Sequence, residues 1–243
     1  MSQMRELNIW NAYINCQNRC RKLSQNNETG YRNPFVTISR QTGAGGVTIS
    51  EKLIALLKDR DPAATCPWTL FDKSLVHAVV EMHHLPGMLE EWMPEDRLSE
   101  FQNFLEELFE VKPSEWTLVH KTSETILHLA SLGCAILVGR GANVVTRRLP
   151  SGFHVRLVGS LKKRIQHAQD YYRLTFREAE QFVIREDRGR KEYLKKHFGK
   201  DVDDPLLYHL VINTDLMGYD EAAQMIVEQV LFLRKKIKEG ALT

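Results

Sequence analysis

The stretch from Phe35 to Ser50 constrains this chain more than any other part of its sequence. Residues 35–39 are mostly apolar or β-branched, residues 40–46 are rich in glycine, and residues 47–59 repeat apolar side chains at helical spacing. A strand, a glycine turn and a helix in this order can hold an anion, because backbone N–H groups curl around it and the helix N-terminus adds partial positive charge. The sequence therefore predicts a phosphate site at the start of that helix.

The loop departs from the common phosphate-loop pattern at its end. That pattern closes with Gly-Lys-Ser/Thr, and its lysine reaches the phosphates. Here Gly46 stands at the lysine position and is followed by Val47. A glycine turn between a strand and a helix can also be a tight connection without a ligand, so the loop alone leaves a structural role open. The residues that would bind the phosphates of a cofactor are Gly43, Ala44, Gly45, Gly46, Val47 and Thr48.

Short apolar runs alternate with helical patterns along the chain. The expected strands lie near 35–39, 68–71, 134–139, 153–159 and 207–213, and the expected helices near 47–59, 73–84, 160–171 and 219–238. Such alternation predicts an α/β domain with a parallel sheet and helices on both faces.

The domain organisation follows from the same pattern. Residues 1–33 are interpreted as an N-terminal helical extension and linker, whose helix is expected to cover the core. Residues 34–243 then form the main domain. An acidic stretch of helical character predicts a helical insertion at about 86–131.

The composition is that of an ordinary globular protein. The chain has 243 residues, of which 43% are hydrophobic and 26% charged, and its net charge is +2. This charge is too small to predict a nucleic-acid or membrane partner, so anion binding must come from local arginines. The sequence has no apolar run long enough to span a membrane and no signal-peptide pattern, so a cytoplasmic location is expected. The sequence predicts no oligomeric state.

The four cysteines, at positions 16, 20, 66 and 134, are expected to be reduced and structural. Cys16 and Cys20 lie one helical turn apart, but no histidine or cysteine cluster with metal-ligand spacing accompanies them. The sequence thus favours neither a disulfide nor a metal centre.

Two further strand ends carry polar residues. Asp72 follows the second expected strand, and Arg140 follows the third, between Gly139 and Gly141. Ligands of open parallel sheets bind beyond the carboxyl ends of the strands. We therefore expect these side chains to share one crevice with the glycine loop.

An arginine-rich segment lies at 185–190, inside a helical pattern. Arg185 and Arg188 are three residues apart, on one helix face, and arginine matches phosphate oxygens in a bidentate way. Asp187 could tether an arginine or approach a metal-bound phosphate. A charged, solvated helix remains the alternative interpretation.

Together these segments resemble the cytidylate kinase-like branch of the nucleoside monophosphate kinases, within the P-loop superfamily. The resemblance extends from about residue 35 to 230 and covers the loop and segments 71–73, 138–143, 154–158, 185–190 and 208–214. In bacterial cytidylate kinases the loop reads Gly-x-x-Gly-x-Gly-Lys-Gly-Thr, so Arg40 takes the place of the first glycine, Gly46 of the lysine and Thr48 of the threonine. The lid of those enzymes reads Arg-Asp-Asp-Arg-Asp-Arg, and residues 185–190 keep all three arginines.

The resemblance implies a three-layer α/β/α fold with a five-stranded parallel sheet in the order 2-3-1-4-5 and a helical lid at about 173–203. It implies ATP-dependent phosphoryl transfer to a nucleoside monophosphate, with CMP or dCMP expected as the acceptor and with ATP and Mg²⁺ as cofactors. Without the lysine, a nucleotide or phosphate sensor and a kinase for another small molecule remain alternatives.

The resemblance also implies residue roles. Asp72 and Arg140 would bind the acceptor, Thr48 and Asp72 are the nearest magnesium ligands, and Arg40 would partly replace the lysine. The catalytic residues so implied are Arg40, Arg185, Asp187, Arg188 and Arg190.

Overall fold

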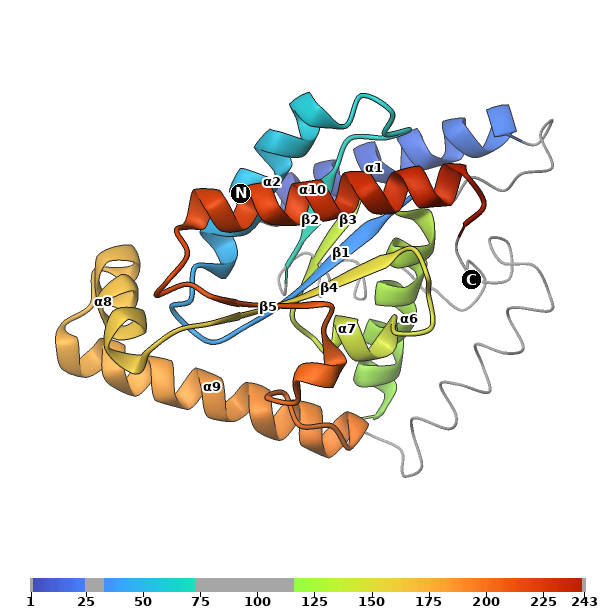
Figure 1. The fold of residues 1–243 in the computed structure, drawn as a ribbon. Helices are drawn as coiled ribbons and strands as arrows, with labels where there is room; N and C mark the ends of the chain where they lie inside the picture. The colour runs from blue at the N-terminus through green and yellow to red at the C-terminus, as the bar shows by residue number, and fades with distance from the viewer. Residues whose placement is uncertain (1, 25–32, 73–115, 242–243) are drawn as a thin grey trace.

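The computed structural model describes residues 2–24, 33–72 and 116–241. Within these ranges, five strands form one parallel sheet in the order β2-β3-β1-β4-β5 (Figure 1). The strands are β1 (Phe35–Arg40), β2 (Thr69–Phe71), β3 (Ala135–Val138), β4 (Gly152–Val158) and β5 (Leu210–Asn213). The parallel sheet and its strand order are as predicted.

The helices are α1 (Ser2–Ser24), α2 (Gly46–Arg60), α6 (Trp116–Leu132), α7 (Ala142–Val145), α8 (Leu161–Tyr172), α9 (Phe176–Phe198), the 3₁₀ turn η1 (Pro205–Leu207) and α10 (Tyr219–Lys238). The helices predicted at 47–59, 160–171 and 219–238 correspond to α2, α8 and α10. The helix predicted at 73–84 and most of the insertion at 86–131 lie outside the described residues. None of the described helices is both long and apolar enough to cross a membrane.

One strand boundary was predicted wrongly. The fifth strand begins at Leu210 rather than at 207, because residues 205–207 form η1. Pro205 has no N–H for a sheet ladder, and the Asp204 side chain accepts a hydrogen bond from the N–H of Leu206. The turn thus competes with the strand for the apolar residues that follow Pro205.

Successive side chains of β1 point to opposite faces of the sheet and pack in two separate parts of the core. Phe35 packs with residues of α1, α6 and α7 on one face, whereas Val36 and Ile38 pack with α2 and α10 on the other. The result is a helix–sheet–helix sandwich, in which α9 runs from α8 to the side of α6 and α7 and packs there through Leu194 and Phe198 (Figure 1). Because the strands are parallel, their carboxyl ends meet at a single edge, where the glycine loop also lies.

Helix α1 packs on the core, as expected for a covering helix. Trp10 is 1% exposed. The hydroxyl of Tyr13 donates a hydrogen bond to the carbonyl of Gly133 at 2.6 Å, and its ring meets Phe71 edge-on at 5.0 Å. The helix therefore lies against the edge strand β2 and the connection from α6 to β3.

The prediction of reduced cysteines was wrong for Cys16 and Cys66, whereas Cys20 and Cys134 are free thiols. Cys16 in α1 and Cys66 in the connection from α2 to β2 form a disulfide, with the sulfur of Cys20 close by. The bonded residues are 50 positions apart in the sequence. They meet only because α1 packs on the domain, so spacing along the chain gives no sign of the pair.

Acid is expected to destabilise the fold through His154. Burial, with a smaller contribution from His209, lowers its pKa to about 3, whereas an unfolded histidine has a pKa of about 6.5. As the pH falls below 6.5 the unfolded state binds the proton first, so stability present at neutral pH is lost. For this group alone the loss is about 2 kcal/mol between pH 7 and pH 5. Urea unfolding at the two pH values should show a loss about 2 kcal/mol smaller in His154→Gln than in the wild type, while buried His128 contributes its own loss to both. His120→Gln, at a half-exposed histidine, should keep the wild-type difference.

Candidate phosphate-binding site

The glycine loop occupies the turn between β1 and α2. Gly43 and Gly45 both have φ of +79°, a conformation that favours glycine. A Cβ at Gly43 would overlap the backbone of Arg164 in α8, and one at Gly45 would lie 2.6 Å from the ring of Tyr219 in α10. The loop is therefore closely packed between α8 and α10, and any side chain at these two positions would disturb it.

The six residues predicted to bind phosphates lie on this loop and on the first turn of α2. Gly45 is the N-cap of α2, and Gly46, Val47 and Thr48 begin the helix. The first N–H groups of a helix have no partners within it, and the helix dipole gives this end partial positive charge. The backbone thus has the arrangement that binds an anion.

Arg40 fills the space beside the missing lysine. A Cβ at Gly46 would lie 3.0 Å from Cγ of Arg40, and a Cβ at Gly139 would overlap its Nη1 atom. The side chain therefore runs past the start of α2 to the end of β3. Burial lowers the pKa of Arg40 to about 10, with a further lowering by Arg190 and an opposing effect of Asp72. An arginine from the end of β1 thus passes position 46 and places its guanidinium beside Gly139.

Asp187 ties α9 to the loop. Its Oδ1 accepts hydrogen bonds from the N–H of Thr42 at 2.6 Å and from the Thr42 hydroxyl at 2.7 Å. Its Oδ2 accepts from Nη1 of Arg164 at 2.6 Å, and that guanidinium also donates to the carbonyl of Thr42. Arg190 donates from Nη1 to the Thr42 hydroxyl and to Asp187. One carboxylate therefore joins α8, α9 and the loop.

The other predicted residues differ in how near they come to the loop. The side chains of Arg185 and Arg188 are 72% and 78% exposed, and Arg188 donates to Glu192 at 2.6 Å. Arg140 has φ of +56°, and its guanidinium lies 5.8 Å from the ring centre of Tyr193 in α9. Asp72 is exposed at the end of β2, and its charge acts on Arg40. Of the lid residues, Asp187 and Arg190 contact the loop in this structure, and Arg185 and Arg188 do not.

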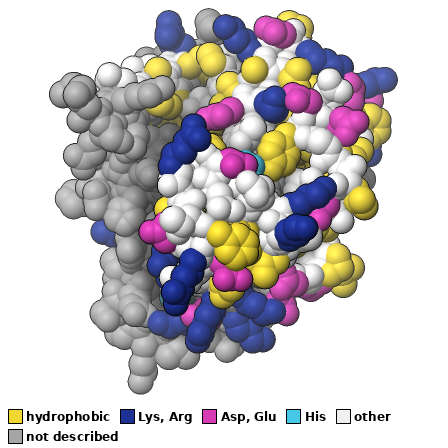
Figure 2. All heavy atoms as spheres, turned by 90° about the vertical axis from the view of Figure 1, so that its left-hand side faces the viewer, with side chains coloured by type: hydrophobic (Ala, Val, Ile, Leu, Met, Phe, Trp, Pro, Cys, Tyr) yellow, Lys and Arg dark blue, Asp and Glu magenta, His cyan; other side chains and the backbone are white. Residues whose placement is uncertain are grey.

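Among the described residues, several pockets adjoin the loop. One of about 60 Å³ lies directly over Gly43 and Gly46. A second, of about 150 Å³, is lined by four arginines together with two aspartates: Arg40, Arg156, Arg188, Arg190, Asp187 and Asp203. A third, of about 400 Å³, lies between α8 and the start of α10 and includes Lys163, His167, Asp215 and Tyr219. Figure 2, seen from the side of α8, shows basic and acidic side chains interspersed, so positive charge gathers locally and not over a whole face.

The sequence model of the cytidylate kinase-like family matches residues 35–216, most of the chain. The chain belongs to this family. An uncharacterised protein from Eubacterium ventriosum ATCC 27560 has a similar fold, with a TM-score of 0.62 and 17% identity over 82% of this chain and 98% of that one. A shikimate kinase from Acinetobacter baumannii, in complex with shikimate, gives a TM-score of 0.44 and 16% identity over 83% and 94% of the two chains, too weak a similarity to support an argument. No curated protein sequence matches the chain.

Two arginines close to the loop were not predicted as site residues. Arg156 in β4 donates to Ser39 and to Asp203, both at 2.9 Å, and its side chain is 5% exposed. Arg164, in the first turn of α8, holds Asp187 as described above. Arg156 could have been recognised in the sequence, because it is a charged residue within the apolar run of β4. Nothing local singles out Arg164, because its partners come from β1 and α9.

Proposed function

We propose that this protein transfers a phosphoryl group from ATP to a nucleoside monophosphate, with CMP or dCMP as the acceptor. Its family supports a nucleotide kinase-like function. The observation that carries the proposal is the Arg40 side chain, which passes beside Gly46 at the N-terminus of α2 and places its partly buried guanidinium beside Gly139. Phosphoryl transfer needs positioning and charge stabilisation but no covalent nucleophile, and such a site can provide both.

In this proposal, the loop N–H groups of residues 43–48 hold the β-phosphate of ATP. The pocket of about 400 Å³ beside Gly43 has room for a nucleoside, and ligand sites usually begin at about 300 Å³. The arginine-lined pocket between α9 and β4 would receive the transferred group. Arg40 and Arg190 offset the negative charge that develops there.

Magnesium fits the oxygen ligands that the site offers. Thr48 supplies a hydroxyl in the first turn of α2, and Asp72 supplies a carboxylate near enough to act on the charge of Arg40. Mg²⁺ usually takes one or two protein oxygens and completes its shell with water and phosphate, which two such residues allow. When bound, the ion would neutralise charge on the phosphates. Thr48 and Asp72 would hold it, while the arginines contact the remaining oxygens.

The space above the glycine loop is small in this structure, which supports a lid that moves. About 60 Å³ lies over Gly43 and Gly46, roughly the volume of two water molecules. In this proposal a triphosphate enters when α9 moves away, with Asp187 releasing Thr42. We infer that the segment at about 173–203 opens to admit nucleotide and closes again. On closing, Arg185 and Arg188 would join Arg190 over the phosphates and exclude water.

Arg140→Ala is expected to lower kcat/KM for the acceptor roughly a hundredfold. Its charged side chain stands at the end of β3 between two glycines with positive φ, and a lost bidentate phosphate contact costs about 2–3 kcal/mol. Steady-state kinetics with the acceptor varied at saturating ATP would measure the change. Arg147→Ala, at an exposed arginine after α7, is the matched control and should behave as wild type. Normal kinetics of Arg140→Ala would remove this residue from the acceptor site.

A sensor without turnover is the second candidate, favoured by the absence of an ammonium group at position 46 and by the covered loop. Coupled ADP release, measured with ATP, Mg²⁺ and a panel of nucleoside monophosphates, separates the two. The kinase proposal expects turnover that is fastest with CMP or dCMP. Tight nucleotide binding by calorimetry, with no ADP release for any acceptor, would instead support the sensor.

A further inference from the structure

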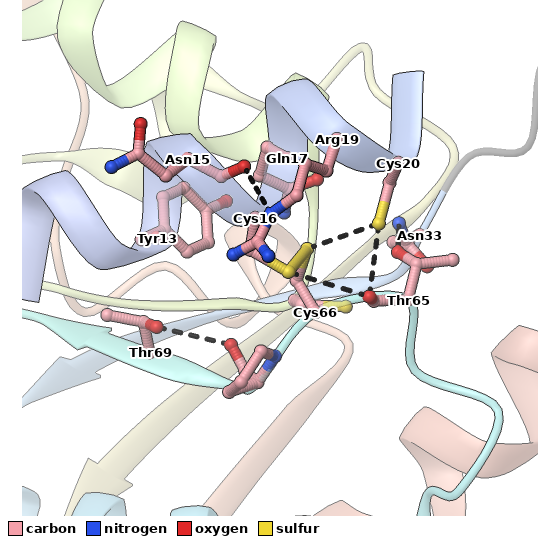
Figure 3. Close-up of a disulfide and its surroundings, with 12 residues drawn as sticks. Tyr13, Asn15, Cys16, Gln17, Arg19, Cys20, Asn33, Thr65, Cys66 and Thr69 are labelled. Carbon is pink, nitrogen blue, oxygen red and sulfur yellow. Dashed lines mark hydrogen bonds between the residues drawn. A yellow bond between two sulfur atoms is a disulfide. The ribbon is translucent and has the colours of Figure 1, made fainter. Parts of the chain in front are cut away.

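Three cysteines converge where α1 meets the connection between α2 and β2 (Figure 3). Cys16 and Cys20 lie on successive turns of α1, and Cys66, 2% exposed, comes from the connection. All three sulfur atoms lie within 4.8 Å of one another. Cys66 precedes β2, so the cluster lies at the amino-terminal edge of the sheet, opposite the phosphate site. The kinase proposal gives it no role.

The disulfide accounts for two of the three sulfurs. Cys16 and Cys66 are bonded, and Sγ of Cys20 remains a thiol 3.6 Å from Sγ of Cys66. The carbonyl oxygen of Thr65 lies close to two of these sulfurs, 3.2 Å from Sγ of Cys20 and 3.7 Å from Sγ of Cys16. A cross-link between α1 and the domain needs only one pair, so the third sulfur and the carbonyl suggest a site with more ligands.

We propose that Cys16, Cys20 and Cys66, when reduced, bind one Zn²⁺ ion through three thiolates. Zinc–sulfur bonds of about 2.3 Å in tetrahedral geometry place sulfurs roughly 3.8 Å apart. The Cys20–Cys66 separation of 3.6 Å is already close to this value, so only Cys16 has to move away from Cys66. Within the described residues no histidine, aspartate or glutamate joins the group. The fourth ligand is then the Thr65 carbonyl or a water molecule.

The disulfide and the metal-bound form exclude each other, because the disulfide uses two of the three ligands. A phosphine reductant gives the S–S bond two electrons, the two sulfurs take up two protons from water, and the phosphine leaves as its oxide. Zn²⁺ then displaces protons from the thiols as the Zn–S bonds form, with no change in its oxidation state. In either form the sulfurs fasten α1 to the connection that precedes β2.

Metal titration of the whole chain tests the site. The protein is reduced with a phosphine, freed of it without oxygen, and titrated with Zn²⁺ against a chromogenic chelator, and with Co²⁺ for its spectrum. We expect one ion per chain and thiolate-to-cobalt charge-transfer absorption. Cys20→Ser, which can still form the disulfide, should bind Zn²⁺ at least tenfold more weakly. Cys134→Ala, at a buried cysteine outside the group, is the matched control and should bind as wild type.

Three results would each overturn the proposal. They are no thiolate–cobalt absorption in the reduced wild type, equal zinc affinity of wild type and Cys20→Ser, and binding by the disulfide form as tight as by the reduced form. Absorption and chelator competition report on sulfur ligation without any catalytic turnover. Failure of the zinc site therefore leaves the kinase proposal untouched, and the reverse also holds.

Discussion

Replacing Arg40 with alanine is expected to lower kcat by roughly 100- to 1,000-fold, the usual cost of removing one preorganised donor from a transition state. The side chain passes within 3.0 Å of where a Cβ at Gly46 would be, and its partly buried guanidinium lies beside Gly139. Since position 46 carries no cation, no neighbouring group in the loop can take over. ATP affinity should fall less than kcat, because the charge on the transferring group develops in the transition state.

The measurement is single-turnover phosphoryl transfer, with the unfolding temperature as a check on the fold. Arg40→Lys keeps the positive charge but loses the planar guanidinium that can bind two oxygens at once, and should retain an intermediate rate. Arg60→Ala, at the far end of α2 and paired with Glu228, is the matched control and should react like the wild type. A wild-type rate in Arg40→Ala would show that the arginine is structural.

Arg190→Ala is expected to lower kcat by roughly a hundredfold, with a smaller effect on nucleotide affinity. Arg190 donates to Thr42 in the loop and to Asp187, and it lines the pocket that also contains Arg40. When α9 opens and closes on nucleotide, this guanidinium is placed to meet the phosphates. Arg177→Ala, an exposed arginine near the start of α9, is the control on the same helix. If both variants had equal kcat, the lid would not act through Arg190.

Much of the fold could be predicted because its signals are local. The run of residues 35–50 contains the strand, the glycine turn and the helix start within one stretch, and the structure reproduces it as β1 and α2. The strand order came from the family resemblance. The start of β5 was missed because Pro205 begins a 3₁₀ turn that uses the same apolar residues.

The site was harder to predict, because its contacts join distant segments. Arg164 reaches Asp187 and Thr42 only after α8 and α9 fold onto the loop, a relation that no spacing reveals. Arg185 and Arg188 share a helix face, but that face is solvated, since the helix turns Asp187 and Arg190 toward the loop. The pairing of Cys16 with Cys66 likewise depends on how α1 docks.

In the proposed kinase, Arg40 supplies the cation that the loop lacks at position 46. The most direct test of this claim is to compare kcat of the wild type, Arg40→Gly, Gly46→Lys and the double variant. A lysine at 46 would start 3.0 Å from Cγ of Arg40, so Gly46→Lys alone should not increase kcat. The double variant removes that obstruction and restores the first glycine and the lysine of the usual loop pattern, and its kcat should be at least tenfold higher than that of Arg40→Gly. A double variant as slow as Arg40→Gly, or an Arg40→Gly as fast as the wild type, would contradict the claim.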